Sequence, residues 1–308
     1  MIDKIKQIIK KPSLVYLYLS YLGYFKNVPD EIHLKRLFKI MIGKPLNLNS
    51  PQTFNEKMQW LKINNRKNEY TNMVDKYEMK KIVSNLIGDS YVIPTIGIYE
   101  KFEDIKFDEL PDQFVIKCTH DSGGIVICND KNNFNIKKAK NKIDKCLKKN
   151  YYWMHREWPY KNVKPRIIIE KYMATEKQPE LIDYKFFCFN GEPKFLYISE
   201  GLSNHSTAKI SFVDMNYNKS QFYRNDYKPF DKLPKKPVGF EKMKELAKKL
   251  SKEIPFVRVD FYEIEDRIYF GELTFYPCSG FIPFEPEKYD KILGDMLKLP
   301  KIEEKDEK

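Results

Sequence analysis

The chain has 308 residues, of which 42% are hydrophobic, 15% aromatic and 32% charged, and its formal net charge is +12 at pH 7. This composition excludes a disordered chain and is typical of a globular protein with two or three lobes and a charged surface. The positive charge favours an anionic partner. Because the basic residues are spread along the chain without an RNA-binding or zinc-finger motif, we expect no nucleic acid among the partners.

Five widely spaced cysteines without a CxxC pair argue against structural disulfides and a zinc cluster, and favour the cytoplasm. Near the N-terminus, the apolar stretch from Leu14 to Phe25 follows four lysines and is too short and too rich in Tyr to span a bilayer. Its pattern favours an amphipathic helix that packs on the core and turns a basic face to solvent. The alternative is a helix lying on the inner face of an anionic membrane, as a peripheral contact.

Helices are predicted throughout residues 1 to 65, and Ser50 or Thr53 can cap the helix that contains "FNEKMQWLK". A further helix over 72–88 ends at Gly88, which is a suitable C-cap. The other elements predicted in this half are strands over 91–99, 113–120 and 125–130 and a Lys-rich helix over 137–149.

In the C-terminal half, a hairpin is predicted to turn at Asn190 and Gly191. The polar segment 200–236 has no clear pattern, and a loop of that length inside a compact domain predicts a lid over a functional site. The remaining predicted elements are strands over 166–173, 183–191, 194–199, 256–264 and 267–277 and a helix over 239–252.

Two carboxylates on the last pair of strands give the most specific chemical signal. Asp260 stands in "VRVDFY" and Glu272 in "YFGELTF", and antiparallel pairing would bring them side by side on one face. Such carboxylates repel each other unless a cation or a proton lies between them, and Mg²⁺ prefers one or two carboxylates with phosphate oxygens. Arg258 projects from the same face as Asp260 and can neutralise charge on a reacting group. The alternative is a surface hairpin with solvated acidic residues.

The segment "FVIKCTHDSGGIVI" can hold a phosphate. Lys117 supplies an ammonium at the end of a strand, and Gly123 and Gly124 let backbone N–H groups approach an anion. His120 and Ser122 can add donors. The segment lacks the GxxxxGK[ST] pattern of a P-loop, and a plain hairpin turn is the alternative.

Two further positions are weak signals by themselves. Lys76 stands at the start of a predicted helix, where a solvated lysine is the ordinary interpretation. Glu170 ends a buried strand before a linker that reaches Asp183. Such a strand end can offer backbone groups to an adenine and a carboxylate to ribose hydroxyls, although it can equally be an ordinary strand end.

The order of these elements resembles the ATP-grasp superfamily over about residues 70 to 285. The resemblance implies an α+β fold in which two lobes grip ATP, here with a mostly helical N-terminal region. It implies that the nucleotide is bound by Lys76, Lys117, His120, Ser122, Gly123, Gly124, Glu170, Lys171, Tyr172, Met173 and Asp183, with Glu180 as an alternative to Asp183 at the ribose. It also implies catalytic roles for Arg258 and Lys117, and Mg²⁺ ligation by Asp260, Glu272 and Thr274. Thr274 replaces the family's usual Asn, so the resemblance is compatible with either one or two bound Mg²⁺ ions.

Longer segments resemble one subgroup, the TupA-like ATP-grasp proteins of teichuronopeptide biosynthesis. They are "TFNEKMQWLK", "DKYEMKKIV", "LPDQFVIKCTHDSGG", "REWPYKNVKPRIIIEKYM" and "DYKFFCFNGEPKF". The resemblance implies a Mg-ATP-dependent carboxylate–amine ligase that activates a sugar acid of a capsular or cell-wall polysaccharide as an acyl phosphate. An amine or amino acid would be its second substrate. The alternatives are a capsule glycosyltransferase, which would need a Rossmann-like half and a DxD motif that this sequence lacks, and a kinase that phosphorylates a sugar.

From this resemblance we expect a helical N-terminal region over 1–70 and a small lobe with the glycine loop over 71–175. A large lobe with the metal site would follow over 176–300, and a solvated tail over 301–308. The acceptor is expected near His120, Arg156, Ser279 and the segment 200–236.

Overall fold

The computed structural model describes residues 12–176, 178–201 and 208–301. The predicted tail from 302 and the N-terminal lysines therefore lie outside the described residues. The α-helices are α2 (Pro12–Tyr21), α3 (Asp30–Met41), α4 (Phe54–Asn64), α5 (Glu69–Val74), α6 (Glu78–Ile87), α7 (Ile136–Leu147), α8 (Tyr152–His155), α9 (Phe240–Leu250) and α10 (Lys288–Met296). Short 3-10 helices are η1 (Asp89–Tyr91), η2 (Phe102–Asp104), η3 (Phe107–Glu109), η4 (Lys131–Asn133), η5 (Trp158–Tyr160) and η6 (Pro277–Gly280).

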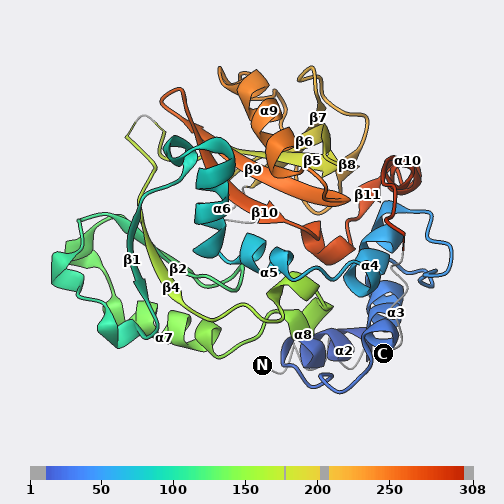
Figure 1. The fold of residues 1–308 in the computed structure, drawn as a ribbon, viewed down its shortest axis with the longest axis horizontal. Coiled ribbons are helices and arrows are strands. Elements are labelled where there is room, and N and C mark those ends of the chain that lie inside the picture. The colour runs from blue at the N-terminus through green and yellow to red at the C-terminus, as the bar shows by residue number, and fades with distance from the viewer. Residues whose placement is uncertain (1–11, 177, 202–207, 302–308) are drawn as a thin grey trace.

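Two antiparallel sheets face each other across the molecule (Figure 1). The small sheet has the order β1-β4-β2-β3, formed by β1 (Thr95–Tyr99), β4 (Ile167–Lys171), β2 (Phe114–Cys118) and β3 (Ile125–Cys128). The large sheet has the order β10-β9-β5-β6-β7, formed by β10 (Arg267–Thr274), β9 (Phe256–Ile264), β5 (Asp183–Phe189), β6 (Glu192–Glu200) and β7 (Lys209–Asp214). A short pair joins β8 (Tyr223–Arg224) to β11 (Phe284–Glu285).

Local sequence signals explain several element boundaries. Thr53 caps α4 in a capping box with Glu56, so that each satisfies a backbone N–H of the other. Asn190 and Gly191 both have positive φ, at 51° and 83°, as the two-residue turn between β5 and β6 requires. Gly88 ends α6 with φ of 113°. These three predictions are confirmed. The predicted helix over 72–88 is instead two helices, because the chain leaves the helix between Val74 and Glu78.

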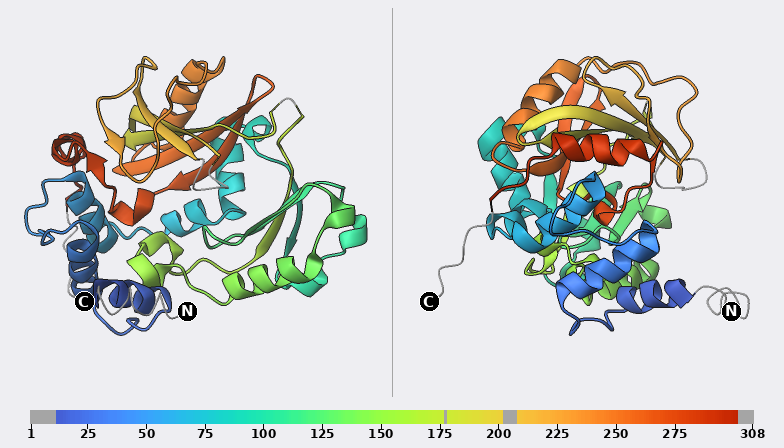
Figure 2. Two further views of the ribbon diagram at one scale, coloured as in Figure 1. Left: turned by 180° about the vertical axis from the view of Figure 1, so that it is seen from behind. Right: turned by 90° about the vertical axis from the view of Figure 1, so that its right-hand side faces the viewer.

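Each sheet has its own hydrophobic core, and Figure 2 shows the same two layers from behind and from the side. The small sheet packs against α7 through Phe114, Ile116 and Ile143, all fully buried. The large sheet carries α9 on one side, and its strand β5 is buried along its whole length. Full burial of one Phe side chain contributes roughly 1.5–3 kcal/mol, so this Phe-rich strand anchors the large lobe.

Helix α4 packs with the C-terminal elements as well as with α3. The Asn55 side chain exchanges two hydrogen bonds with the backbone of Ile282, and the Asn55 backbone N–H donates to Asp290 in α10. Phe54 and Met58 belong to the core of the large sheet. The helical region expected over 1–70 therefore contributes its last helix to the core of the large lobe.

The prediction of a lid over 200–236 is wrong for the part of this segment that joins the large sheet and its core. Residues 209–214 form the edge strand β7, paired with β6, and Ile210, Phe212 and Phe222 are buried in the core. Part of the predicted lid, residues 202–207, lies outside the described residues. The Asn, Ser and Lys residues around β7 hid its apolar positions in the sequence pattern.

Within the described part of the chain, every helix is too short or too polar to reach across a lipid bilayer.

Candidate functional site

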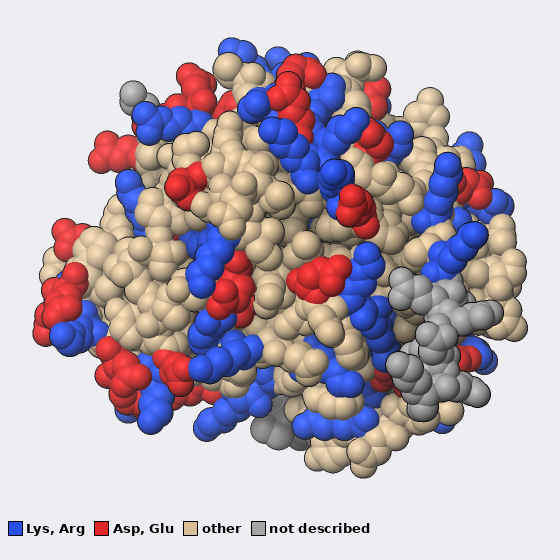
Figure 3. All heavy atoms as spheres, in the orientation of Figure 1, with Lys and Arg blue, Asp and Glu red and all other residues tan. Residues whose placement is uncertain are grey.

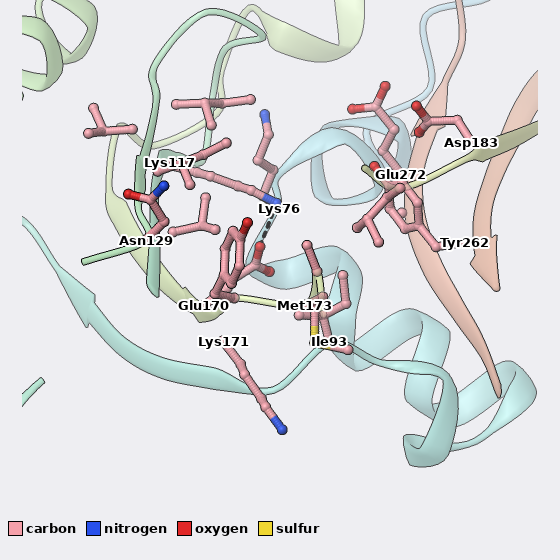
Figure 4. Close-up of a pocket in the computed structure, with 18 of the residues that line it drawn as sticks. Lys76, Ile93, Lys117, Asn129, Glu170, Lys171, Met173, Asp183, Tyr262 and Glu272 are labelled. Carbon is pink, nitrogen blue, oxygen red and sulfur yellow. Dashed lines mark ion pairs between the residues drawn. The ribbon is translucent and has the colours of Figure 1, made fainter. Parts of the chain in front are cut away.

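A cavity of about 980 Å³ lies between the two sheets, where the chain brings together residues from both lobes (Figure 4). Nine of the predicted nucleotide and metal residues line it. They are Lys76, Lys117, Ser122, Glu170, Lys171, Tyr172, Met173, Asp183 and Glu272, and the alternative ribose residue Glu180 lines it as well.

Lys76 is positioned by the loop between α5 and α6. Its backbone N–H donates to the Thr119 carbonyl at 3.1 Å, and its ammonium donates to the Asp121 carbonyl in the glycine turn. Arg166 anchors both ends of this loop, with ion pairs of 2.7 Å to Asp75 and 2.9 Å to Glu78. Figure 4 shows the Lys76 side chain pointing along the cavity in the same direction as that of Glu272.

Lys117 and Glu170 meet on the face of the small sheet that lines the cavity. Their Nζ and Oε2 atoms are 2.6 Å apart, and Lys80 from α6 pairs with the other Glu170 oxygen. Burial favours the protonated Glu170 carboxyl, but the two ammonium groups outweigh it and hold the pKa of Glu170 below its usual value. Glu170 therefore fixes both lysines at the cavity wall as an ionised carboxylate.

A buried ion-pair chain crosses the large sheet beside the cavity. Lys185 lies 2.9 Å from both Asp183 and Asp260, and Arg258 forks onto Asp260 with distances of 2.7 and 2.6 Å. Asp260 is only 1% exposed and does not line the cavity. Because β5 and β9 are neighbours, their register sets Lys185 directly opposite Asp260. Burial raises the pKa of Asp260 even though Arg258 and Lys185 oppose the rise.

A β-bulge turns Glu272 toward the cavity. Phe270 pairs with Phe261 and Leu273 with Val259, so that Gly271 and Glu272 together lie opposite the single residue between those partners. The Glu272 side chain is 43% exposed and accepts from Arg258 at 2.9 Å. Loss of contact with water disfavours the ionised Glu272 carboxylate, but the positive charges of Arg258, Lys185 and Lys76 outweigh this effect and lower the pKa of Glu272.

The linker after β4 forms another wall of the cavity. Lys171, Tyr172 and Met173 all line it, but Figure 4 shows the end of the Lys171 side chain pointing away from the cavity. The Lys171 backbone N–H already donates to the Pro94 carbonyl at 3.0 Å. The apolar residues Ile93 and Met173 give this end of the cavity a surface suited to a flat, uncharged ring.

Several predicted residues lie outside the cavity lining. The His120 ring bonds through Nε2 to the Cys146 carbonyl at 3.1 Å, inside the small lobe. Gly123 and Gly124 belong to the turn but not to the wall, and a Cβ on Gly124 would come within 2.7 Å of the Cys118 sulfur. Thr274 also lies off the wall and donates to Glu272 at 3.2 Å.

The acceptor position expected near Arg156 is wrong, because this residue is fully buried. Its Nε lies 2.7 Å from Asp30, and its guanidinium donates to the carbonyl of Phe25 at 2.6 Å. Arg156 therefore ties α8 to the N-terminal helices.

Ser279 is buried in η6, and its hydroxyl donates to Glu157 at 2.6 Å. Lys62 donates to the Ser279 carbonyl at 2.7 Å, and Gln59 to the Gly280 carbonyl at the same distance. Burial lowers the pKa of Lys62 to about 7 and raises the pKa of Glu157. This buried polar cluster holds the left-handed turn that directly follows the Glu272 strand.

Four cavity lysines were missed from the sequence, namely Lys80, Lys138, Lys142 and Lys185. Lys185 stands two residues after Asp183, which places both on one face of a strand that otherwise consists of aromatic residues and Cys. Lys80 stands four residues after Lys76. A charged residue in so apolar a strand was the available signal for Lys185, because burying an ammonium requires a carboxylate partner.

The donor set fits a Mg²⁺ ion that enters with a nucleotide. Among the described residues, no three His, Cys, Asp or Glu side chains are grouped to hold a metal by themselves. Mg²⁺ at phosphate sites takes one or two carboxylates and fills its shell with phosphate oxygens and water. Glu272 offers one carboxylate at the cavity, and Asp260 can offer a second only by giving up an ion pair with Arg258 or Lys185.

Comparison with solved structures gives matches at low identity. The D-alanine–D-alanine ligase of Helicobacter pylori is 16% identical over 80% of this chain and 70% of its own, with a TM-score of 0.43. That of Bacillus anthracis is 18% identical over 71% of this chain and 58% of its own, with a TM-score of 0.36. The biotin carboxylase domain of the 2-oxoglutarate carboxylase of Hydrogenobacter thermophilus is 16% identical over 75% of this chain and 47% of its own, with a TM-score of 0.41. The chain thus spans 58% of the length of the Bacillus anthracis ligase.

No curated protein sequence matches the chain. The model of the TupA-like ATP-grasp family matches residues 56–298, which include both sheets and every residue that lines the cavity. The predicted α+β, ATP-grasp fold is confirmed by this match and by the two antiparallel sheets. The chain belongs to the TupA-like ATP-grasp family.

Proposed function

We propose that this protein is a cytoplasmic, Mg-ATP-dependent ligase that joins the carboxylate of a sugar acid to an amine in capsular or cell-wall polysaccharide biosynthesis. The observation that carries the proposal is the cavity itself. Lys76 reaches it from the loop between α5 and α6, Lys117 from β2 and Lys185 from β5, and Glu272 and Asp183 line it as well. This arrangement suits a polyphosphate accompanied by a divalent cation.

ATP would lie with its adenine against Ile93, Tyr172 and Met173 and its triphosphate toward Lys76 and Glu272. Asp183, or alternatively Glu180, would accept hydrogen bonds from the ribose hydroxyls. Both carboxylates line the cavity. The volume of about 980 Å³ leaves room for a second substrate beside the nucleotide.

In the first step, a carboxylate oxygen of the sugar acid attacks the γ-phosphorus of ATP, and the bond to the β,γ-bridging oxygen breaks to release ADP. In the second step, the amine nitrogen attacks the acyl carbon, phosphate leaves, and the nitrogen loses a proton. Lys76 and Lys117 would neutralise the transferring phosphoryl group. Arg258, expected from the sequence to meet the tetrahedral oxyanion, is buried off the cavity wall and pairs with Asp260 and Glu272, so it would instead position Glu272. Bound Mg²⁺, held by Glu272, would supply further charge neutralisation.

Product analysis tests the proposal. The protein is incubated with ATP, Mg²⁺ and uronic acids, free or nucleotide-linked, with and without amino acids, and ADP and phosphate are quantified. A ligase yields equal amounts of ADP and phosphate that depend on the amine. ADP formation without free phosphate and without need of an amine contradicts ligation and supports the sugar kinase. All sheets in the described residues are antiparallel, which disfavours the Rossmann-like half that a glycosyltransferase would need.

A further inference from the structure

Helix α2 presents an apolar face to solvent. Its sequence, PSLVYLYLSY, contains no charged residue, so the basic face expected for this helix is absent from it. Leu14, Tyr18 and Tyr21 are 40%, 56% and 50% exposed, and Leu22 and Tyr24 directly after the helix are 47% and 71% exposed. A helix that is apolar all round is normally buried on all sides, so an open face of this kind indicates a partner.

The opposite face of α2 is attached to the rest of the molecule. Ser20 is buried, and its hydroxyl donates to the Met154 carbonyl at 2.8 Å. Tyr16 bonds to His33 in α3 at 2.7 Å. Leu14, Tyr18 and Tyr21 follow one another at intervals of four and three residues, which places them on one stripe away from these contacts. The helix is therefore held in a fixed orientation with its stripe outward.

The sequence on both sides of the stripe is basic, and one described lysine contacts it. Between Asp3 and Asp30 the sequence contains five lysines, Lys4, Lys6, Lys10, Lys11 and Lys26, and no acidic residue. Lys149 from beyond α7 bonds to the Tyr21 hydroxyl, and its Nζ lies 3.9 Å from the ring centroid. The lower margin of the molecule in Figure 3, where α2 lies in Figure 1, is mostly uncharged and basic.

We propose that the stripe formed by Leu14, Tyr18, Tyr21, Leu22 and Tyr24 docks the protein on an anionic lipid surface. Tyrosine suits this place because its ring enters the headgroup region while its hydroxyl stays hydrated. The lysines meet the negative surface potential of the lipids. A second copy of the chain is a poorer occupant, because a symmetric contact would join two copies of the same lysine-rich, acid-free stretch of sequence without a counter-charge.

Vesicle co-sedimentation tests this proposal independently of the ligase activity. The full chain is mixed with vesicles of phosphatidylcholine alone or with added phosphatidylglycerol. We expect binding only to the anionic vesicles and a decrease with added salt. The triple variant Tyr18→Ser, Tyr21→Ser, Leu22→Ser is expected to bind at least tenfold more weakly, with an unchanged circular dichroism spectrum. Val238→Ser, at the 76% exposed Val238 before α9, is the matched control and is expected to bind as the wild type does.

Three results would overturn the proposal. The first is equal binding to neutral and anionic vesicles. The second is a triple variant that binds as tightly as Val238→Ser. The third is a concentration-dependent dimer of the wild type, seen by sedimentation velocity, that the triple variant abolishes, because the stripe would then be an interface between two copies. If the triple variant unfolds, Tyr18→Ser and Leu22→Ser are measured singly, and each is expected to lower vesicle binding.

Discussion

At the scale of single residues, Asp260 and Glu272 are neighbours with different surroundings. Asp260 is enclosed by Arg258 and Lys185, whereas Glu272 faces the cavity through the bulge in β10. Burial raises the pKa of Asp260, and the nearby cations lower that of Glu272. The pair is thus one open carboxylate supported by one that is locked in an ion-pair chain, and the two are expected to differ in mutational effect.

Glu272→Gln removes the open carboxylate and keeps the shape of the side chain. We expect ATP turnover to fall by about 100-fold or more, because the carboxylate that would hold Mg²⁺ beside the phosphates is lost. The apparent affinity for Mg²⁺, measured by titration of ADP formation, is expected to weaken in parallel. Glu265→Gln, in the turn of the same hairpin, is the control and should turn over as the wild type does. An unaltered Mg²⁺ dependence in Glu272→Gln would contradict its role as a ligand.

Lys185→Met leaves Asp183 and Asp260 buried without their shared cation. Removing one partner of a buried ion pair costs about 3–5 kcal/mol, and we expect a loss of this size in the free energy of unfolding. Denaturant titration of the variant measures it. Lys194→Met, an exposed lysine on the adjacent strand β6, should change stability by less than about 0.5 kcal/mol. Comparable losses in the two variants would show that the ion-pair chain does not support the sheet.

At the scale of elements, sequence patterns located the boundaries that depend on local chemistry. The capping box at Thr53 and the turn at Asn190-Gly191 each depend only on residues a few positions apart in the sequence. The bulge at Gly271 was not predictable, because it depends on how β10 pairs with β9. The Lys185 contact with Asp260 joins residues 75 apart in sequence, and no local pattern encodes that pairing. The cavity was predictable mainly because the order of its elements resembles a known family.

The turn of η6 shows how closely two elements approach each other. Gly280 has φ of 67°, and a Cβ there would lie 2.5 Å from the Met58 Cβ in α4. Gly43 has φ of 82° but open space around it. We expect Gly43→Ala to cost about 1–2 kcal/mol from backbone strain alone, and Gly280→Ala to cost about 1–3 kcal/mol more from overpacking. Denaturant unfolding compares them, and equal costs would contradict the close packing of η6 on α4.

At the scale of the whole molecule, two buried histidines link the N-terminal helices to the large lobe. His33 bonds to the Met154 carbonyl at 3.1 Å, and the Nδ1 atom of His155 lies 2.9 Å from the Ser279 hydroxyl, within hydrogen-bond distance. Burial lowers the pKa of His33 to about 4 and that of His155 to about 3. Both rings are therefore neutral in the folded protein over a pH range in which the unfolded chain protonates them.

This difference predicts a pH dependence of stability. Because the folded pKa values lie below the unfolded value of about 6.5, the stabilisation is complete above pH 6.5 and is lost as the pH falls toward 4. Each histidine adds a slope of about 1.4 kcal/mol per pH unit. Denaturant unfolding between pH 7 and 5 measures it, and His33→Gln should have a shallower slope than the wild type. Identical slopes would show that His33 is protonated equally in both states.

The central claim is that this cavity activates a carboxylate with ATP. The direct measurement uses a uronic acid whose carboxylate carries a heavy oxygen isotope, together with ATP, Mg²⁺ and an amine, followed by mass analysis of the released phosphate. The account predicts phosphate that has gained one heavy oxygen, formed in equal amount to ADP and only when the amine is present. Phosphate without the label, or label retained wholly in the sugar acid while ADP accumulates, would contradict it.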